Sequence, residues 1–359
     1  MDREEEFQKI INSVSSEFKV FSNKNVLLSN EDSLNVLKKI PSGSIGLILT
    51  DPPYHSTKKD NIRNDTSFVS DDEYLAWMEL FFKEWKRILR PNGSVFMFCS
   101  SAMESKLQSR MEDEFNILSN IVWTKPNQPG FDGWKQKMKK ESLRQWYPHS
   151  ERIIFAEPAF DGNMNRSYFA NILRKKRVEA KISAHELAEK IGAYGKVNHG
   201  GSVSNWETGR NIPSKEQYSK IINVFNEHGV FDFPCYEDAI RPFMVNSNVE
   251  FTDVWNFPSV RPYKGKHPAE KPVDMLKHAI IATTFENDIV LDCFAGSGNT
   301  GLAALELNRK ILLIEIEEKW VNQMKEKFFP SDLFSLDVEL TQSKRSIFLE
   351  PQLLKVSLS

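Results

Sequence analysis

The stretch Leu47-Ile48-Leu49-Thr50-Asp51-Pro52-Pro53-Tyr54 places the strongest constraint on the fold. Its apolar and β-branched start predicts a buried parallel strand, which the prolines end because they lack the N–H that a sheet ladder needs. Open α/β sheets bind ligands beyond the carboxyl ends of their strands, so we expect Asp51 and Tyr54 in a rigid loop at such a site. A carboxylate acceptor beside a ring that can stack suits a flat, amino-bearing group such as a nucleobase. A simple strand-ending turn is the alternative, since Asp and Pro are common turn formers.

A second stretch, Ile289-Val290-Leu291-Asp292-Cys293-Phe294-Ala295-Gly296-Ser297-Gly298-Asn299-Thr300, has the pattern of a strand, a glycine-rich turn and a helix start. The glycines permit a tight turn and a close approach of the backbone to a ligand. A further apolar run over 311–314 ends at Glu315, and an acid at that position can bind both ribose hydroxyls of a nucleoside. The third glycine of the dinucleotide fingerprint is missing. The pattern therefore favours a mononucleoside ligand over NAD.

Apolar runs alternate with helical periodicity along the chain, which predicts an α/β fold with a doubly wound, mostly parallel sheet. Strands are expected at 26–29, 47–50, 94–99, 120–123, 152–156, 289–292 and 311–314, with a helix from Asp71 that ends at Pro91-Asn92-Gly93.

The composition bounds the class of protein. The 359 residues leave room for two or three domains, or for one domain with an insertion. A net charge of −2 means that any nucleic-acid site must be a local patch. No apolar run approaches the ~18–20 residues of a membrane span, so no membrane association is expected. The three scattered cysteines indicate buried thiols in a reducing cytoplasm and offer no metal-ligand spacing.

Two regions carry the candidate nucleic-acid contacts. The first is a basic segment flanked by Trp134, Trp146 and Tyr147, whose cations could grip a phosphate backbone: Lys135, Lys137, Lys139, Lys140 and Arg144. A solvated charged face is the alternative. The second region, 166–228, resembles the phage-repressor type of helix-turn-helix, with a capping box at Ser183-Ala184-His185-Glu186 and a later Ser-x-x-Trp-Glu-x-Gly pattern. Its turn, 193–201, is longer than that pattern allows, and a helical insert that packs on protein is the alternative. Its candidate DNA contacts are Lys175, Lys176, Arg177, Ser204 and Asn205.

Phe294-x-Gly296-x-Gly298 together with Asp51-Pro52-Pro53-Tyr54 resembles the S-adenosylmethionine-dependent amino-methyltransferases of DNA. The catalytic motif precedes the glycine-rich motif, an order that is similar to the family's β-class, a circular permutation of the usual Rossmann-like fold. Further matches to the family are His267-Pro268-x-x-Lys271-Pro272 and Asn30-Glu31-Asp32. The whole arrangement, with the stretch 150–157 ahead of the insert, resembles prophage-type members. The resemblance covers 24–158 and 236–328. It implies a catalytic half (24–158) and a cofactor-binding half (236–328). The basic and helix-turn-helix-like content of the insert between them (159–235) predicts a mainly helical DNA-recognition region. The N-terminal extension (1–23) is charged and polar and is expected to be a short helix packed on the outside, and a C-terminal tail (329–359) follows the second half.

The resemblance also implies roles. Asp51 and the Pro52 carbonyl would accept hydrogen bonds from the target amine, with Pro53 stiffening the loop and Tyr54 stacking on a base flipped out of duplex DNA. Gly296 and Gly298 would let the backbone approach the methionine of the cofactor. The remaining cofactor contacts would be Asp32 at adenine, Glu315 at ribose, Asp292 and Phe294 at the wall, and Lys271 and Thr300 at the methionine end. No metal is required.

An Asp at the head of the motif usually accompanies methylation of adenine N6 in this family, and Ser that of cytosine N4. N6-adenine is therefore the favoured product, with N4-cytosine as the alternative. A different class, a helix-turn-helix regulator with an inactive methyltransferase fold, stays open, as does methylation of RNA. A cognate restriction endonuclease and a homodimer are further partners that the family allows.

Overall fold

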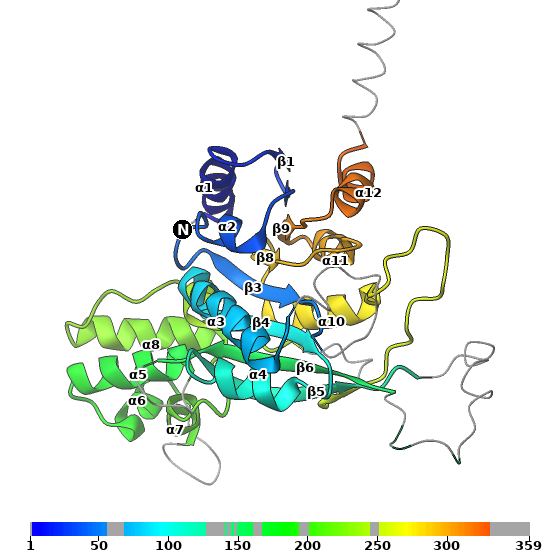
Figure 1. Ribbon diagram of the computed structural model, residues 1–359. Coiled ribbons are helices and arrows are strands. Elements are labelled where there is room, and N and C mark those ends of the chain that lie inside the picture. Colours follow the sequence, from blue (N-terminus) through cyan, green and yellow to red (C-terminus); the bar gives the residue numbers. More distant parts are fainter. Residues whose placement is uncertain are drawn as a thin grey trace, which may run out of the picture.

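The computed structural model describes residues 2–55, 68–126, 141, 144, 146, 149–160, 167–193, 201–244 and 251–330. It consists of one nine-stranded sheet with helices on both faces, and a helical lobe that projects beside the sheet (Figure 1). The strand order is β1-β2-β9-β8-β3-β4-β6-β5-β7. The prediction of a doubly wound α/β fold is thereby confirmed.

The strands run β1 (Val20–Ser22), β2 (Val26–Ser29), β3 (Ile45–Thr50), β4 (Leu89–Cys99), β5 (Phe115–Trp123), β6 (Glu151–Pro158), β7 (Val254–Trp255), β8 (Ile289–Asp292) and β9 (Lys310–Ile314). β2, β9, β8, β3 and β4 are mutually parallel, whereas β6 is antiparallel to both of its neighbours and β1 is antiparallel at the edge. β3 lies between β4 and β8, with Leu47 opposite Val290. Two motifs that are far apart in the chain therefore end side by side at one edge of the sheet.

The helices form two layers. The first layer comprises α1 (Arg3–Ser15), α2 (Ser33–Leu37), α3 (Asp71–Ile88) and α4 (Glu104–Met111), and the second comprises α10 (Val273–Thr283), α11 (Asn299–Glu306) and α12 (Glu318–Phe328). Each layer buries its apolar side on one face of the sheet, because successive side chains of a strand point to opposite faces. In β3, Ile48 belongs to the first core, and Leu47 and Leu49 to the second.

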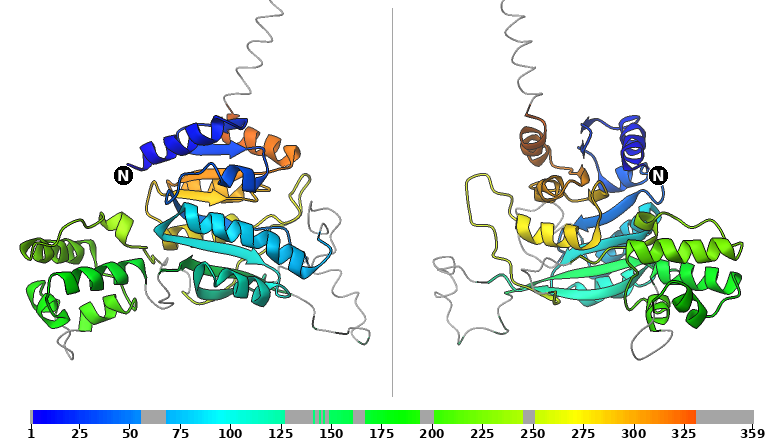
Figure 2. Two further views of the ribbon diagram at one scale, coloured as in Figure 1. Left: turned by 60° about the vertical axis from the view of Figure 1, so that its left-hand side comes forward. Right: turned by 180° about the vertical axis from the view of Figure 1, so that it is seen from behind.

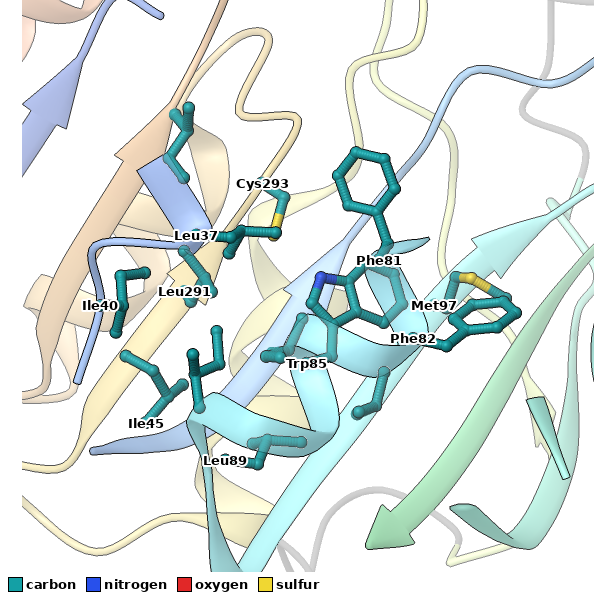
Figure 3. Packing of buried hydrophobic residues seen from close by; sticks show 14 of the residues in the cluster. Leu37, Ile40, Ile45, Phe81, Phe82, Trp85, Leu89, Met97, Leu291 and Cys293 are labelled. Atoms are coloured by element: carbon teal, nitrogen blue, oxygen red, sulfur yellow. The ribbon is translucent and has the colours of Figure 1, made fainter. Parts of the chain in front are cut away.

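Aromatic residues of α3 dominate the first core (Figure 3). Phe81, Phe82 and Trp85 are buried against the sheet, and Cys293 packs in the same cluster. Ser70 caps the start of this helix by accepting a hydrogen bond from the Glu73 N–H. The rigid helix thus supports the segment that follows β8.

The helical lobe has its own apolar core and is built from α5 (Tyr168–Glu179), α6 (Ala184–Lys190), α7 (Gly201–Glu207), α8 (Lys215–Glu227) and α9 (Tyr236–Ala239). Figure 2 shows it as a separate mass of helices next to the sheet. It is joined to the sheet through Asn92, whose amide donates to the carbonyls of Glu237 and Ile240 at 2.8 and 3.0 Å. A chain that leaves the sheet after β6 returns at β7, so the lobe is an insertion into the α/β fold.

Three local expectations were wrong. Pro91-Asn92-Gly93 does not separate helix from strand, because β4 starts directly after α3 and Leu89 already pairs with Ile45. Residues 3–15 are part of the first core rather than an external segment, since Phe7, Ile10 and Val14 are buried there. Cys235 is exposed, whereas Cys99 and Cys293 are buried. Within the described ranges, none of the helices has the length and apolarity of a bilayer span.

Candidate functional site

A pocket of about 600 Å³ lies at the carboxyl ends of β3, β8 and β9. Parallel strands end at the same edge of a sheet, so the residues that follow them are brought together there. Asp51 follows β3, Asp292 closes β8 and Glu315 follows β9, and all three line the pocket. Asp32, the residue that caps α2 after β2, lines it as well.

Glu315 holds the glycine-rich turn through hydrogen bonds to its carboxylate. Its carboxylate accepts the N–H of Gly296 on Oε2 and the N–H of Glu317 on Oε1, both at 2.8 Å. Burial raises the pKa of this carboxyl above its usual range, against the lowering effect of the two backbone hydrogen bonds. The acid and the turn therefore form one preorganised unit.

The two glycines have different neighbours. Both have positive φ angles, +49° at Gly296 and +72° at Gly298. A Cβ on Gly296 would meet the ring of His267 at 3.0 Å, and a Cβ on Gly298 would meet Met324 Cγ at 2.7 Å. Gly296 lines the pocket and Gly298 does not. The structure thus explains Gly298 by its packing under α12 and not by a ligand.

Phe294 forms an apolar wall of the pocket together with α3. Its ring centroid lies 5.2 Å from that of Phe81 and 5.9 Å from that of Trp77, and all three side chains line the pocket. A cavity lined by both polar groups and an aromatic wall suits a ligand with a flat ring and hydroxyl groups.

The base of the pocket contains a buried cluster of charges around Lys271. Its ammonium forms ion pairs with Asp51 Oδ2 and with Glu151, the latter at 3.3 Å. Glu151 also pairs with Lys125 and accepts the hydroxyl hydrogen of Tyr54 at 3.2 Å. Two lysines thus face two carboxylates, which neutralises the cluster and permits its burial.

The two carboxyls of this cluster have different proton affinities. Burial raises the pKa of Asp51, and Lys271 only partly opposes this effect. Burial also acts on Glu151, but Lys271 and Lys125 outweigh it and lower the pKa of that carboxyl to about 2. Asp51 Oδ1 is buried and makes no hydrogen bond to any residue in the described part of the chain. It is the acceptor that the cluster leaves for a ligand.

The structure brings together most of the residues that the sequence singled out. With the exception of Gly298, every predicted catalytic and cofactor-binding residue lines the pocket: Asp51, Pro52, Pro53, Tyr54, Asp32, Lys271, Asp292, Phe294, Gly296, Thr300 and Glu315. Lys271 lies beside Asp51, where its ammonium is already paired. The sequence assigned no role to Glu151, Trp77 or Phe81. The acid at the head of the apolar run 152–156 was the one available signal for Glu151, because a polar residue at the end of a buried strand needs a partner.

None of the predicted DNA contacts in the described part of the chain lines the pocket. Lys135, Lys137, Lys139 and Lys140 fall outside the described residues, and Arg144 is exposed. On the helical lobe Lys175 and Ser204 are exposed, and Lys176 and Asn205 are half-buried. Arg177 holds α5 against α7, because its guanidinium donates to both carboxylate oxygens of Glu207 at 2.6 and 3.0 Å. Within the described residues no cluster of His, Cys, Asp and Glu has the arrangement of a metal site.

Comparison with known proteins identifies relatives over most of the chain. Residues 45–326 match the family model N6_N4_Mtase, described as DNA methylase. The DNA adenine methyltransferase YhdJ of Escherichia coli (strain K12) is 26% identical over 305 residues, which cover 84% of this chain and 82% of that protein. The type II methyltransferase M2.LlaDCHI of Lactococcus lactis subsp. cremoris is 24% identical over 320 residues, covering 86% of this chain and 90% of that protein.

Among solved structures, the PvuII DNA methyltransferase, named as cytosine-N4-specific, is similar with a TM-score of 0.50 and 18% identity. The similarity covers 85% of this chain and 86% of that one. At this identity the likeness bears on the fold alone, which agrees with the sheet and helix layers of this chain.

Proposed function

Since this chain belongs to the DNA methylase family, we propose that it transfers a methyl group from S-adenosylmethionine to the exocyclic N6 amine of adenine in duplex DNA. The observation that carries the proposal is the buried, unpartnered Oδ1 of Asp51, in the same pocket as the Glu315–Gly296 unit. The pocket therefore offers an acceptor for an amine and an acid for a nucleoside, next to each other.

The pocket suits the cofactor in size and chemistry. Glu315 suits ribose hydroxyls, because each carboxylate oxygen keeps further acceptor capacity beyond its one backbone hydrogen bond. Asp32 is exposed in the pocket and suits an adenine amine, and Phe294 with Trp77 gives the apolar wall. Asp292 and Thr300 lie at the end of β8 and the start of α11, near the methionine end of the proposed site.

The chain's own residues hold and activate the amine. Asp51 Oδ1 accepts one amine hydrogen and the Pro52 carbonyl accepts the other, which directs the nitrogen lone pair outward. Bound S-adenosylmethionine would supply a sulfonium methyl group, so that the amine lone pair would form the new N–C bond while the C–S bonding pair leaves with sulfur. Asp51 then takes the surplus proton of the alkylated nitrogen, a role for which its raised pKa suits it. Tyr54 stacks on the flipped base, which offsets part of the few kcal/mol that unstacking costs.

Adenine is proposed over cytosine because Asp heads the motif and because YhdJ is named as an adenine enzyme. The test is nucleoside mass spectrometry on plasmid DNA from cells that lack their own DNA methylation and express this chain or its Asp51→Ala variant. We expect N6-methyladenine with the intact chain only, while both proteins bind S-adenosylmethionine in titration. N4-methylcytosine would overturn the choice of base, and the absence of both marks would overturn the function.

The helical lobe and the basic segment 135–147 are proposed to recognise the DNA. Support comes from the insertion of the lobe between β6 and β7 and from the exposed Lys175 and Ser204 on it. The type II relatives also support a cognate restriction endonuclease as a partner. Deletion of residues 166–228 is expected to abolish sequence-specific methylation; a deletion variant that still methylates its sites fully would refute the assignment.

A further inference from the structure

The charge cluster at the base of the pocket contains an acid that the reaction itself does not use. Glu151 opens β6, and Asp51 follows β3, which is separated from β6 in the sheet by β4. We propose that Glu151 is a positioning residue for the methyl-transfer reaction, which acts through Lys271 to hold Asp51 with its free oxygen toward the target amine. This inference rests on the function proposed above.

Lys271 has little freedom to move away from this arrangement. Its side chain is 8% exposed, and its ammonium lies 5.0 Å from the ring centroid of Phe98 and 5.6 Å from that of Tyr54. Its carbonyl accepts a hydrogen bond from the Asn299 amide at 3.0 Å, which ties this residue to the start of α11. Backbone, aromatic rings and counter-charges therefore all fix the position of the ammonium.

The two carboxylate oxygens of Asp51 have different surroundings in the cluster. Oδ2 pairs with Lys271, and Oδ1 has no hydrogen-bond partner among the residues that the structure describes. A carboxylate tied at one oxygen cannot rotate without breaking the ion pair, so Oδ1 stays directed at the ligand side. The orientation of the catalytic acceptor is thus set before substrate arrives.

Glu151 is needed so that the ammonium of Lys271 is shared between two carboxylates and does not pair with Asp51 alone. The carboxylate of Glu151 pairs with the same ammonium at 3.3 Å, and it also pairs with Lys125 and accepts the hydroxyl hydrogen of Tyr54. Without this second acid, the two lysines would face Asp51 as the one remaining carboxylate of the cluster. Both oxygens of Asp51 would then attract ammonium groups, and the free acceptor would be lost.

The pKa of Asp51 distinguishes this positioning role from a purely structural one, because loss of a merely structural residue would leave that pKa unchanged. The ionisable groups around Asp51 come from every neighbouring element: Tyr54 in its own loop, Cys99 at the end of β4, Lys125 after β5, Glu151 on β6, Lys271 before α10 and Asp292 on β8. The negative charge of Glu151 raises the pKa of Asp51, and the positive charge of Lys271 lowers it. Removal of the Glu151 charge should therefore lower the pKa of Asp51, and removal of the Lys271 charge should raise it.

The experiment measures single-turnover methylation of unmethylated plasmid DNA from about pH 5.5 to 9 by the full chain, with enzyme and S-adenosylmethionine in excess. The variants are Glu151→Gln and Lys271→Met. Glu157→Gln is the matched control, because Glu157 lies on the same strand, is 8% exposed and pairs with Arg241 at 3.2 Å. Titration with S-adenosylmethionine and thermal denaturation accompany each protein.

We expect Glu151→Gln to lower the rate about 100-fold and to shift the acid limb of the profile to lower pH by about one unit. Lys271→Met should lower the rate and shift the limb to higher pH. Cofactor affinity should stay within about threefold of wild type in Glu151→Gln, and the control should match wild type. If Lys271→Met does not fold, the rate and limb of Glu151→Gln decide the question.

An active wild type with an unchanged rate and profile in Glu151→Gln would overturn the inference and leave the proposed function standing. A shift of the acid limb in the same direction in both variants would also overturn the inference alone. A wild type without methyl transfer at any pH would overturn the proposed function and this inference with it.

Discussion

The hydroxyl of Thr50 donates a hydrogen bond to Asp292 Oδ1 at 2.8 Å and joins the two motifs of the site at its base. Thr50 ends β3 directly before the loop 51–54, and Asp292 ends β8 directly before the glycine-rich turn. The same oxygen of Asp292 accepts the N–H of Phe294 at 3.1 Å. This buried contact fixes the distance between the part of the pocket proposed for the amine and the part proposed for the cofactor.

The cost of this arrangement should be measurable as a dependence of stability on pH. Burial raises the pKa of Asp292 from 3.8 to about 6. The folded state therefore holds the proton more tightly than the unfolded state, and the free energy of unfolding falls as pH rises from about 4 to about 6. We expect Asp292→Asn to gain about 2–3 kcal/mol over wild type across this window and to keep that gain up to pH 8. Urea denaturation without cofactor measures it.

Thr50→Val is the companion variant for that measurement. The loss of the hydroxyl donor should raise the pKa of Asp292 further, so the decline in stability should extend to higher pH. A difference between wild type and Asp292→Asn that is constant with pH would contradict the prediction.

Glu315→Gln should weaken the binding of S-adenosylmethionine. A Gln side chain has one carbonyl oxygen, so its NH₂ group would face one of the two backbone N–H groups that the carboxylate now accepts. We expect the Kd to rise about 30- to 100-fold, because hydrogen bonds to a charged group contribute about 1.5–3 kcal/mol. Isothermal titration measures it, with the exposed Glu318→Gln as the control. Equal affinities of the two variants would argue against a ligand role for Glu315.

Gly298→Ala should destabilise the fold through α12. The added Cβ would lie 2.7 Å from Met324 Cγ, and φ at +72° costs a non-glycine residue about 1 kcal/mol or more. Met324→Ala removes the closest contacts and leaves the cost of φ and the 3.0 Å approach to Phe328 Cε2. The double variant should therefore lose less stability than the sum of the single variants, by about 1 kcal/mol or more in a denaturation cycle. Additive losses would show that the contact with Met324 is not the constraint.

On the helical lobe, Lys175→Ala and Arg177→Met should separate DNA binding from stability. Lys175 is exposed, so its loss should reduce the salt dependence of DNA binding by about one unit of slope and change stability by less than about 0.5 kcal/mol. Arg177 is paired with Glu207, so its loss should cost about 1–3 kcal/mol of stability. DNA titrations in a salt series and urea denaturation give the two readouts. An unchanged slope in Lys175→Ala would remove this lysine from the DNA-binding surface.

Much of the site could be predicted from the sequence because its residues follow buried strands directly. The apolar runs that end at Thr50, Asp292 and Ile314 identify three strands, and parallel strands present their carboxyl ends at one edge. The place of Lys271 could not be predicted in this way, because it lies in a turn whose position depends on α10 and α11. Nor could the packing of Gly298, since a positive φ shows in the sequence as glycine whether a ligand or a side chain is the neighbour.

The sequence by itself determined which apolar runs form the central strands, where these strands end and which polar residues follow them, because strand burial and chain breaks depend on local composition. Only the tertiary structure decided which of these segments are neighbours. In that structure Glu151 lies beside Lys271, residues 3–15 are part of the core, and β6 is antiparallel to its neighbours. The physical reason is that an apolar pattern fixes how much surface a segment must bury, whereas its partner depends on the packing of the whole chain.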